Sequence, residues 1–179
     1  MKSAANLLSD IEETMGDLWL PGIYREIILK MRTRSYEFPT LPKPADPQIH
    51  HTLLGVELKA GRRRMLCPDL TTARYLAVFV RLGSRAVAIP YDITKISLVA
   101  DELERSWHRM LLLADNMTTD RTLAFRTRVR KLLIAKVLAE IAAAGPGPRI
   151  PEFKQSTRQR EPRKDTKCTK EFQDPEESA

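Results

Sequence analysis

The chain has 179 residues, 42% of them hydrophobic and 30% charged, which suits one globular domain with a sizeable core and a polar tail. Lysine and arginine outnumber aspartate and glutamate by 30 to 23, and the resulting net charge of +7 favours an anionic partner such as nucleic acid. Two cysteines and no apolar run of membrane-spanning length exclude a disulfide-rich or membrane-embedded class, so we expect a soluble, cytoplasmic protein without a membrane partner.

Two helices are expected at the N-terminus. Apolar residues recur at helical spacing between residues 3 and 19, and Ser3 can cap this first helix. Pro21 suits the first turn of a second helix. Glu26 lies among the apolar residues of the second helix, four residues before Lys30, so an exposed ion pair is its simplest role.

A stiff, extended connection follows these helices. Four prolines fall between Pro39 and Pro47, and prolines remove the backbone donors that a central strand needs. Asp46 lies inside this segment, where capping a turn is the simplest role for its carboxylate.

The segment from residue 53 to 92 combines a strand, a basic turn, a helix and a second strand. Its first apolar run leads to Glu57 and Lys59, which point to one face of a strand because they are two residues apart. A carboxylate and an ammonium are costly to bury unless they are paired or bind a ligand, although an ordinary surface strand explains this pair equally well. The turn that follows contains three consecutive arginines, which favour phosphate contact: Arg62, Arg63 and Arg64.

A helix is expected after Pro68 and Asp69, and Gly83 is placed to end it. The apolar run from Ala86 to Ile89 then predicts a strand that is covered on both faces. A strand, a returning helix and a second strand predict a right-handed βαβ crossover with two parallel strands.

Two long helices and a polar segment complete the chain. Residues 93–145 predict a helical hairpin, and residues 146–179 a flexible, charged tail with little apolar surface. The hairpin offers a surface for a homodimer or a larger assembly. Its second helix has no acidic residue between Asp120 and Glu140, so its basic residues form either a solvated face or a second nucleic-acid surface. The candidates for nucleic-acid contact on this helix are Arg126, Arg130 and Lys131.

The order of these features resembles the core of the PD-(D/E)XK nuclease superfamily, in particular its Holliday-junction resolvase-like and virus-type replication-repair branches. The matching features are a helix with Glu26, an extended segment with Asp46 and a strand that ends in Glu57-Leu58-Lys59. The likeness covers Pro21 to Asp92. It implies an α/β fold for residues 1–92, in which a small mixed sheet with flanking helices forms a restriction-endonuclease-like core.

The resemblance implies a nuclease that depends on Mg²⁺ or Mn²⁺, since such ions neutralise a scissile phosphate and activate water. It implies Asp46 and Glu57 as metal ligands, Lys59 as the residue that orients the attacking water, and Glu26 as an outer ligand or orienting group. The alternative is a non-catalytic nucleic-acid-binding or assembly subunit with a degenerate nuclease-like core, because the prolines around Asp46 disfavour a regular strand. A third reading is a protein-interaction module built on the two long helices.

Overall fold

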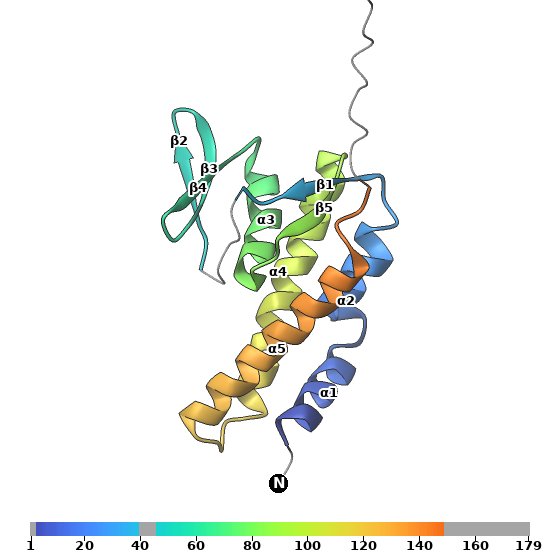
Figure 1. Ribbon diagram of the computed structural model, residues 1–179, viewed down its shortest axis with the longest axis vertical. Coiled ribbons are helices and arrows are strands. Elements are labelled where there is room, and N and C mark those ends of the chain that lie inside the picture. Colours follow the sequence, from blue (N-terminus) through green and yellow to red (C-terminus); the bar gives the residue numbers. More distant parts are fainter. Residues whose placement is uncertain (1–2, 40–45, 149–179) are drawn as a thin grey trace, which may run out of the picture.

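The computed structural model describes residues 3–39 and 46–148, and it has a mixed α/β fold with two small antiparallel sheets (Figure 1). Most of the predicted tail and residues 40–45 of the proline-rich connection lie outside the described residues. In chain order the helices are α1 (Ala4–Met15), α2 (Leu20–Ile23) with a π-helical turn (Tyr24–Ile28), α3 (Leu70–Leu82), α4 (Ile93–Asn116) and α5 (Leu123–Ala144). The strands are β1 (Thr33–Glu37), β2 (Gln48–Thr52), β3 (Gly55–Ala60), β4 (Arg63–Cys67) and β5 (Ala86–Pro90).

The helix ends follow local sequence signals. The Oγ of Ser3 accepts a hydrogen bond from the backbone N–H of Asn6 at the start of α1, as expected for a cap. The carboxylate of Asp69 accepts from the N–H of Thr72 at 2.7 Å and caps α3. Gly83 ends α3 in the left-handed conformation with φ 77°, so its predicted position as a helix terminator is confirmed.

The strands pair differently from the βαβ prediction, which is wrong. Strand β3 forms an antiparallel sheet with β2 and β4, while β5 pairs antiparallel with β1, so one predicted mixed sheet is replaced by two antiparallel ones. In Figure 1 both sheets lie in the upper half of the molecule, the three-stranded sheet on one side of α3 and the two-stranded sheet on the other. Residues Arg63 and Arg64 lie in β4 rather than in a turn, and only Gly61 and Arg62 separate the two strands of the hairpin.

Two tyrosines explain why β5 has no parallel neighbour. The backbone N–H of Ala88 donates to the hydroxyl of Tyr24 at 2.9 Å, and the hydroxyl of Tyr75 donates to the carbonyl of Ala88. Tyr24 then donates to the carbonyl of Gly145 at 2.8 Å, beyond the end of α5. Both backbone groups of Ala88 are satisfied by side chains, so β5 offers no open position there for a further strand.

One hydrophobic core joins the sheets to the helices. Its members extend from Ile11 in α1 through Leu58 in β3 and Phe79 in α3 to Leu103 in α4 and Ile141 in α5. The helices α4 and α5 therefore pack on the rest of the chain as well as on each other. None of the helices in the described ranges is long and apolar enough to cross a membrane.

Three buried side chains that lose a proton at high pH make the stability of the fold sensitive to alkali. Burial, with the Asp69 carboxylate as a second cause, raises the pKa of the Cys67 thiol from 9.0 to about 11. Burial also raises the pKa of Tyr24 above 10.0 and that of Tyr75 well above it. The folded state thus holds these protons more tightly than the unfolded state does.

We expect these three groups to leave the free energy of unfolding unchanged between about pH 6 and 8.5 and to lower it as the pH rises from about 9 to 11. Each group has a raised pKa in the folded state, so its stabilisation is fully present below the ordinary pKa and is lost as the pH passes through the folded value. For Cys67, a rise of about two pKa units corresponds to about 2 to 3 kcal/mol. Urea unfolding at several pH values measures this effect, and a curve that stays flat up to about pH 11 would contradict it.

Candidate nucleic-acid interface

The three-stranded sheet has an inner face against α3 and an outer face toward solvent. Leu58 in β3 and its partner Met65 in β4 are buried, with 0% and 7% of their surfaces exposed. Side chains alternate along a strand, so the neighbours of these residues point to the opposite face. The outer face therefore carries Gln48, His50, Glu57, Lys59, Arg64 and Leu66. The prediction that Glu57 and Lys59 share a face is confirmed.

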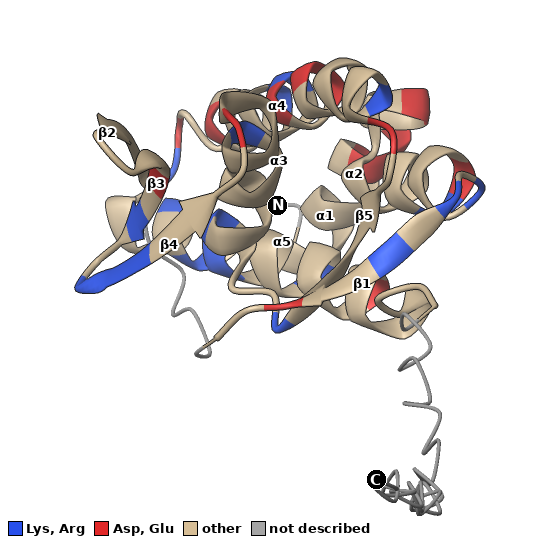
Figure 2. Cartoon of the chain, turned by 90° about the horizontal axis from the view of Figure 1, so that it is seen from above, with Lys and Arg blue, Asp and Glu red and all other residues tan. Residues whose placement is uncertain are grey.

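The β3–β4 hairpin presents unpaired positive charge. Arg62 and Arg63 are exposed, and no ion pair reaches either of them from the residues that the structure describes. Figure 2 shows basic residues at and beside the turn of this hairpin. On the outer face, Nη1 of Arg64 lies 3.8 Å from Oε2 of Glu57, and the Arg64 side chain stays 69% exposed. We use the name basic hairpin for Lys59, Arg62, Arg63 and Arg64.

Glu57 is partly buried on the outer face, and Arg64 is its ion-pair partner in the described part of the chain. Only 19% of its side chain is exposed, and His50 lies directly opposite it in β2 while Leu66 lies opposite it in β4. The Arg64 guanidinium is therefore the charged group placed to compensate the Glu57 carboxylate in its half-buried position. The ion pair with Arg64 within the sheet is thus enough to explain the position of Glu57 without a bound ligand.

The two other carboxylates of the predicted site, Asp46 and Glu26, have ion-pair partners of their own. Asp46 is 94% exposed and its Oδ1 lies 3.8 Å from Nε of Arg81 at the end of α3. It precedes His50, the strand partner of Glu57, by four residues, or about 13 Å of extended chain. Glu26 is exposed and pairs with Lys30, whose hydrogen bond lowers the pKa of the Glu26 carboxyl.

These positions do not form a metal-binding group. Within residues 3–39 and 46–148, no three or more His, Cys, Asp or Glu side chains lie together in a way that would hold a metal ion. Asp46 and Glu57 each have a guanidinium as their nearest ionic partner, and an arginine competes with a cation for the carboxylate. The residues present therefore do not fit a bound metal in this arrangement, and Mg²⁺ or Mn²⁺ stays a prediction.

The basic residues of α5 have a different environment from the basic hairpin. Nε of Arg130 donates to Oδ1 of Asp115 in α4 at 2.8 Å, its Nη2 donates to Oδ2, and Arg126 lies 3.8 Å from the same carboxylate. The Arg130 hydrogen bonds lower the pKa of Asp115. Two of the three predicted contacts on this helix thus join α5 to α4, whereas Lys131 is exposed.

The exposed leucines are a feature that sequence reasoning missed. Leu53 and Leu54 were expected to begin a buried strand, and this expectation is wrong because they form the β2–β3 turn with 107% and 81% of their surfaces exposed. The signal for a turn was the glycine that follows them, Gly55. On the long helices, Leu112 and Leu123 are also exposed, and a homodimer or larger assembly stays a prediction.

Comparison with protein-family models, curated proteins and solved structures found no significant match.

Proposed function

We propose that the chain is a non-catalytic nucleic-acid-binding subunit that contacts phosphates through the basic hairpin. The observation that carries the proposal is the exposure of Arg62 and Arg63 without an ion-pair partner in the described part of the chain. A guanidinium presents several donors in a planar fork that suits phosphate oxygens. Lys59 and Arg64 add positive charge on the outer face of the sheet, whereas Arg63, the neighbour of Arg64 in β4, points to the other face of the hairpin.

Double-stranded nucleic acid fits this surface better than single strands. The three strands and their turns, residues 48–67, contain no Phe, Tyr or Trp, the large rings on which unpaired bases stack best, and the smaller rings there belong to His50 and His51. A two-stranded ribbon is narrow enough to approach a groove of a duplex, and arginines beside its turn reach the flanking phosphates. The proposed contacts are therefore mainly with the backbone and carry little sequence information.

We expect binding to weaken strongly as salt is added. If all four side chains of the basic hairpin contact phosphates, the slope of log K against log salt is about −3.6, and affinity falls about 100-fold between about 50 and 200 mM salt. Fluorescence anisotropy with a labelled duplex and a single strand of the same sequence measures both the slope and the preference. Binding that is absent at low salt or insensitive to salt would contradict the proposal.

The nuclease reading, with its restriction-endonuclease-like core, is the second candidate. The observation on its side is that Glu57 and Lys59 share the outer face of β3, with His50 opposite Glu57. This reading predicts cleavage of a branched, duplex or single-stranded substrate in Mg²⁺ or Mn²⁺, and loss of cleavage in Glu57→Gln and Lys59→Met. Duplex binding without cleavage under any of these conditions separates the proposed function from the nuclease.

A further inference from the structure

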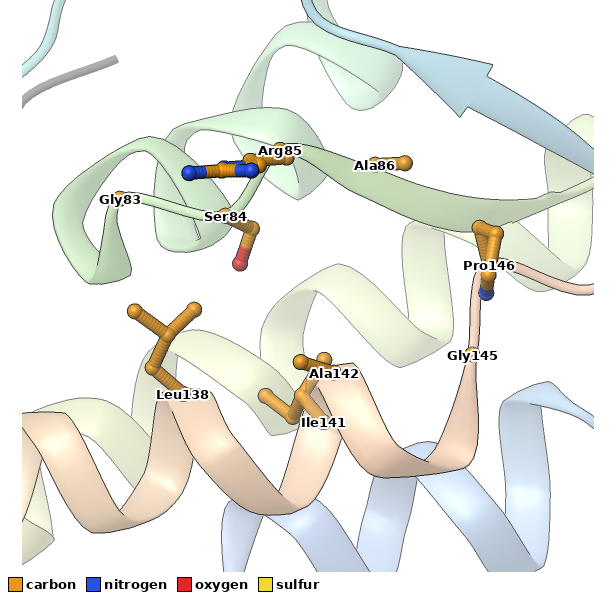
Figure 3. A pocket seen from close by; sticks show the side chains of 9 residues that line it. All are labelled: Gly83, Ser84, Arg85, Ala86, Leu138, Ile141, Ala142, Gly145 and Pro146. Atoms are coloured by element: carbon orange, nitrogen blue, oxygen red, sulfur yellow. The ribbon is translucent and has the colours of Figure 1, made fainter. Parts of the chain in front are cut away.

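A cavity of about 300 Å³ lies between the segment that follows α3 and the last turns of α5 (Figure 3). Small residues create this space, because Gly83 and Ala86 line one wall and Ala142 lines the other. The remaining lining from α5 is aliphatic, with Leu138 and Ile141. None of the described lining residues belongs to the basic hairpin.

Ser84 and Arg85 are the polar residues among those that line this largely apolar cavity, and Ser84 is the buried one. It is only 2% exposed, and its Oγ has no hydrogen-bond partner in the described structure. Figure 3 shows this hydroxyl pointing toward α5 and into the cavity. The backbone N–H of Ser84 is already used, since it donates to the carbonyl of Phe79 at the end of α3. A buried hydroxyl without a partner is unfavourable unless a bound molecule supplies one.

We propose that this cavity binds a small, neutral, largely apolar molecule whose hydroxyl or carbonyl group hydrogen-bonds to Ser84. A cavity of about 150 Å³ holds benzene, so about 300 Å³ has room for roughly a dozen non-hydrogen atoms. A neutral ligand suits the cavity because its lining is aliphatic around Ser84, and the charged lining residue, Arg85, does not point with Ser84 toward α5 (Figure 3). This site is independent of the proposed nucleic-acid contacts.

The test compares 2-naphthol with naphthalene, which differ only by the hydroxyl group. Amide chemical shifts of the full chain are followed by NMR as each compound is added. Both are expected to shift the amides of Gly83, Ala86 and Ala142, and 2-naphthol is expected to bind about tenfold more tightly through one hydrogen bond. In Ser84→Ala the two compounds should bind equally, whereas Ser97→Ala, which alters a serine of α4 outside the cavity, should keep the tenfold difference.

A second variant tests the cavity without altering Ser84. Ala142 is exposed at the mouth of the cavity, so Ala142→Leu should fill the space, abolish the binding of both compounds and leave the fold intact. Ser84→Ala should not lower the melting temperature, because it removes a hydroxyl that lacks a partner. Three results would each overturn the proposal: no shift in the full chain, no preference for 2-naphthol, or a preference that Ser84→Ala preserves.

Discussion

Replacing Arg62, Arg63 and Arg64 together by glutamate is expected to lower the affinity for duplex nucleic acid at least about 100-fold near 0.15 M salt. Each lost phosphate contact removes the release of one bound counterion, so the slope of log K against log salt should also fall by about 3. The three side chains are exposed, so the change leaves the core packing untouched, but it removes the Arg64 counter-charge of Glu57, and circular dichroism therefore checks that the sheet is retained. Anisotropy titrations at four or more salt concentrations measure both quantities.

The matched control changes the same amount of charge elsewhere on the surface. Arg25, Arg105 and Arg109 are exposed and lie outside the basic hairpin, in the π-helical turn and in α4. Their joint replacement by glutamate should weaken binding only a few-fold, through the change in net charge. If the two triple variants weaken binding equally, the protein binds by overall charge and the hairpin has no special role.

Tyr24→Phe is expected to lower the free energy of unfolding by about 2 to 4 kcal/mol. The hydroxyl of Tyr24 accepts from the backbone N–H of Ala88 and donates to the carbonyl of Gly145, and the tyrosine is 0% exposed. Phenylalanine keeps the ring in its edge-on contact with Phe79 but leaves two backbone groups without a partner. Because the free energy of unfolding of a protein is usually about 5 to 15 kcal/mol, the expected loss from removing this one hydroxyl is a large fraction of the total.

Two further tyrosine variants are expected to lower the free energy of unfolding by smaller amounts than Tyr24→Phe. Tyr75→Phe leaves only the carbonyl of Ala88 unpaired and should lower the free energy of unfolding by about 1 to 3 kcal/mol. Tyr36→Phe makes the same chemical change on β1, at a half-buried ring that packs against Phe38, and should alter stability by less than about 0.5 kcal/mol. Urea unfolding followed by circular dichroism ranks the three variants. A loss in Tyr24→Phe no larger than in Tyr36→Phe would mean that the hydroxyl does not hold β5 in place.

The parts of the fold that sequence predicted well are those that depend on neighbouring residues. Ser3, Asp69 and Gly83 act on helix ends within three or four residues of themselves, so their type and position carry enough information. Strand pairing depends on distant residues instead. The hydroxyls of Tyr24 and Tyr75 reach Ala88 from 64 and 13 positions away, and no local pattern announces such contacts.

The same distinction applies to the candidate site. The shared face of Glu57 and Lys59 follows from the two-residue period of a strand and was predictable. The pairing of Asp46 with Arg81, and of Arg130 with Asp115, depends on how separate elements pack, so sequence reasoning treated Asp46 as a metal ligand and Arg130 as a phosphate contact. The sequence showed the charges of Asp46 and Arg130, but it did not show which residue each of them pairs with.

Because Cys67 is buried, its reaction with a thiol reagent can be used to measure local opening of the sheet. Cys67 is 3% exposed on the inner face beside α3, whereas the preceding residue, Leu66, faces solvent and is 64% exposed. An alkylating reagent can reach the thiol only when β4 separates from α3, so in a Cys168→Ser background the labelling rate counts local opening events. A duplex bound to the outer face would make this opening rarer. Binding to the outer face would therefore lower the alkylation rate of Cys67 on the inner face.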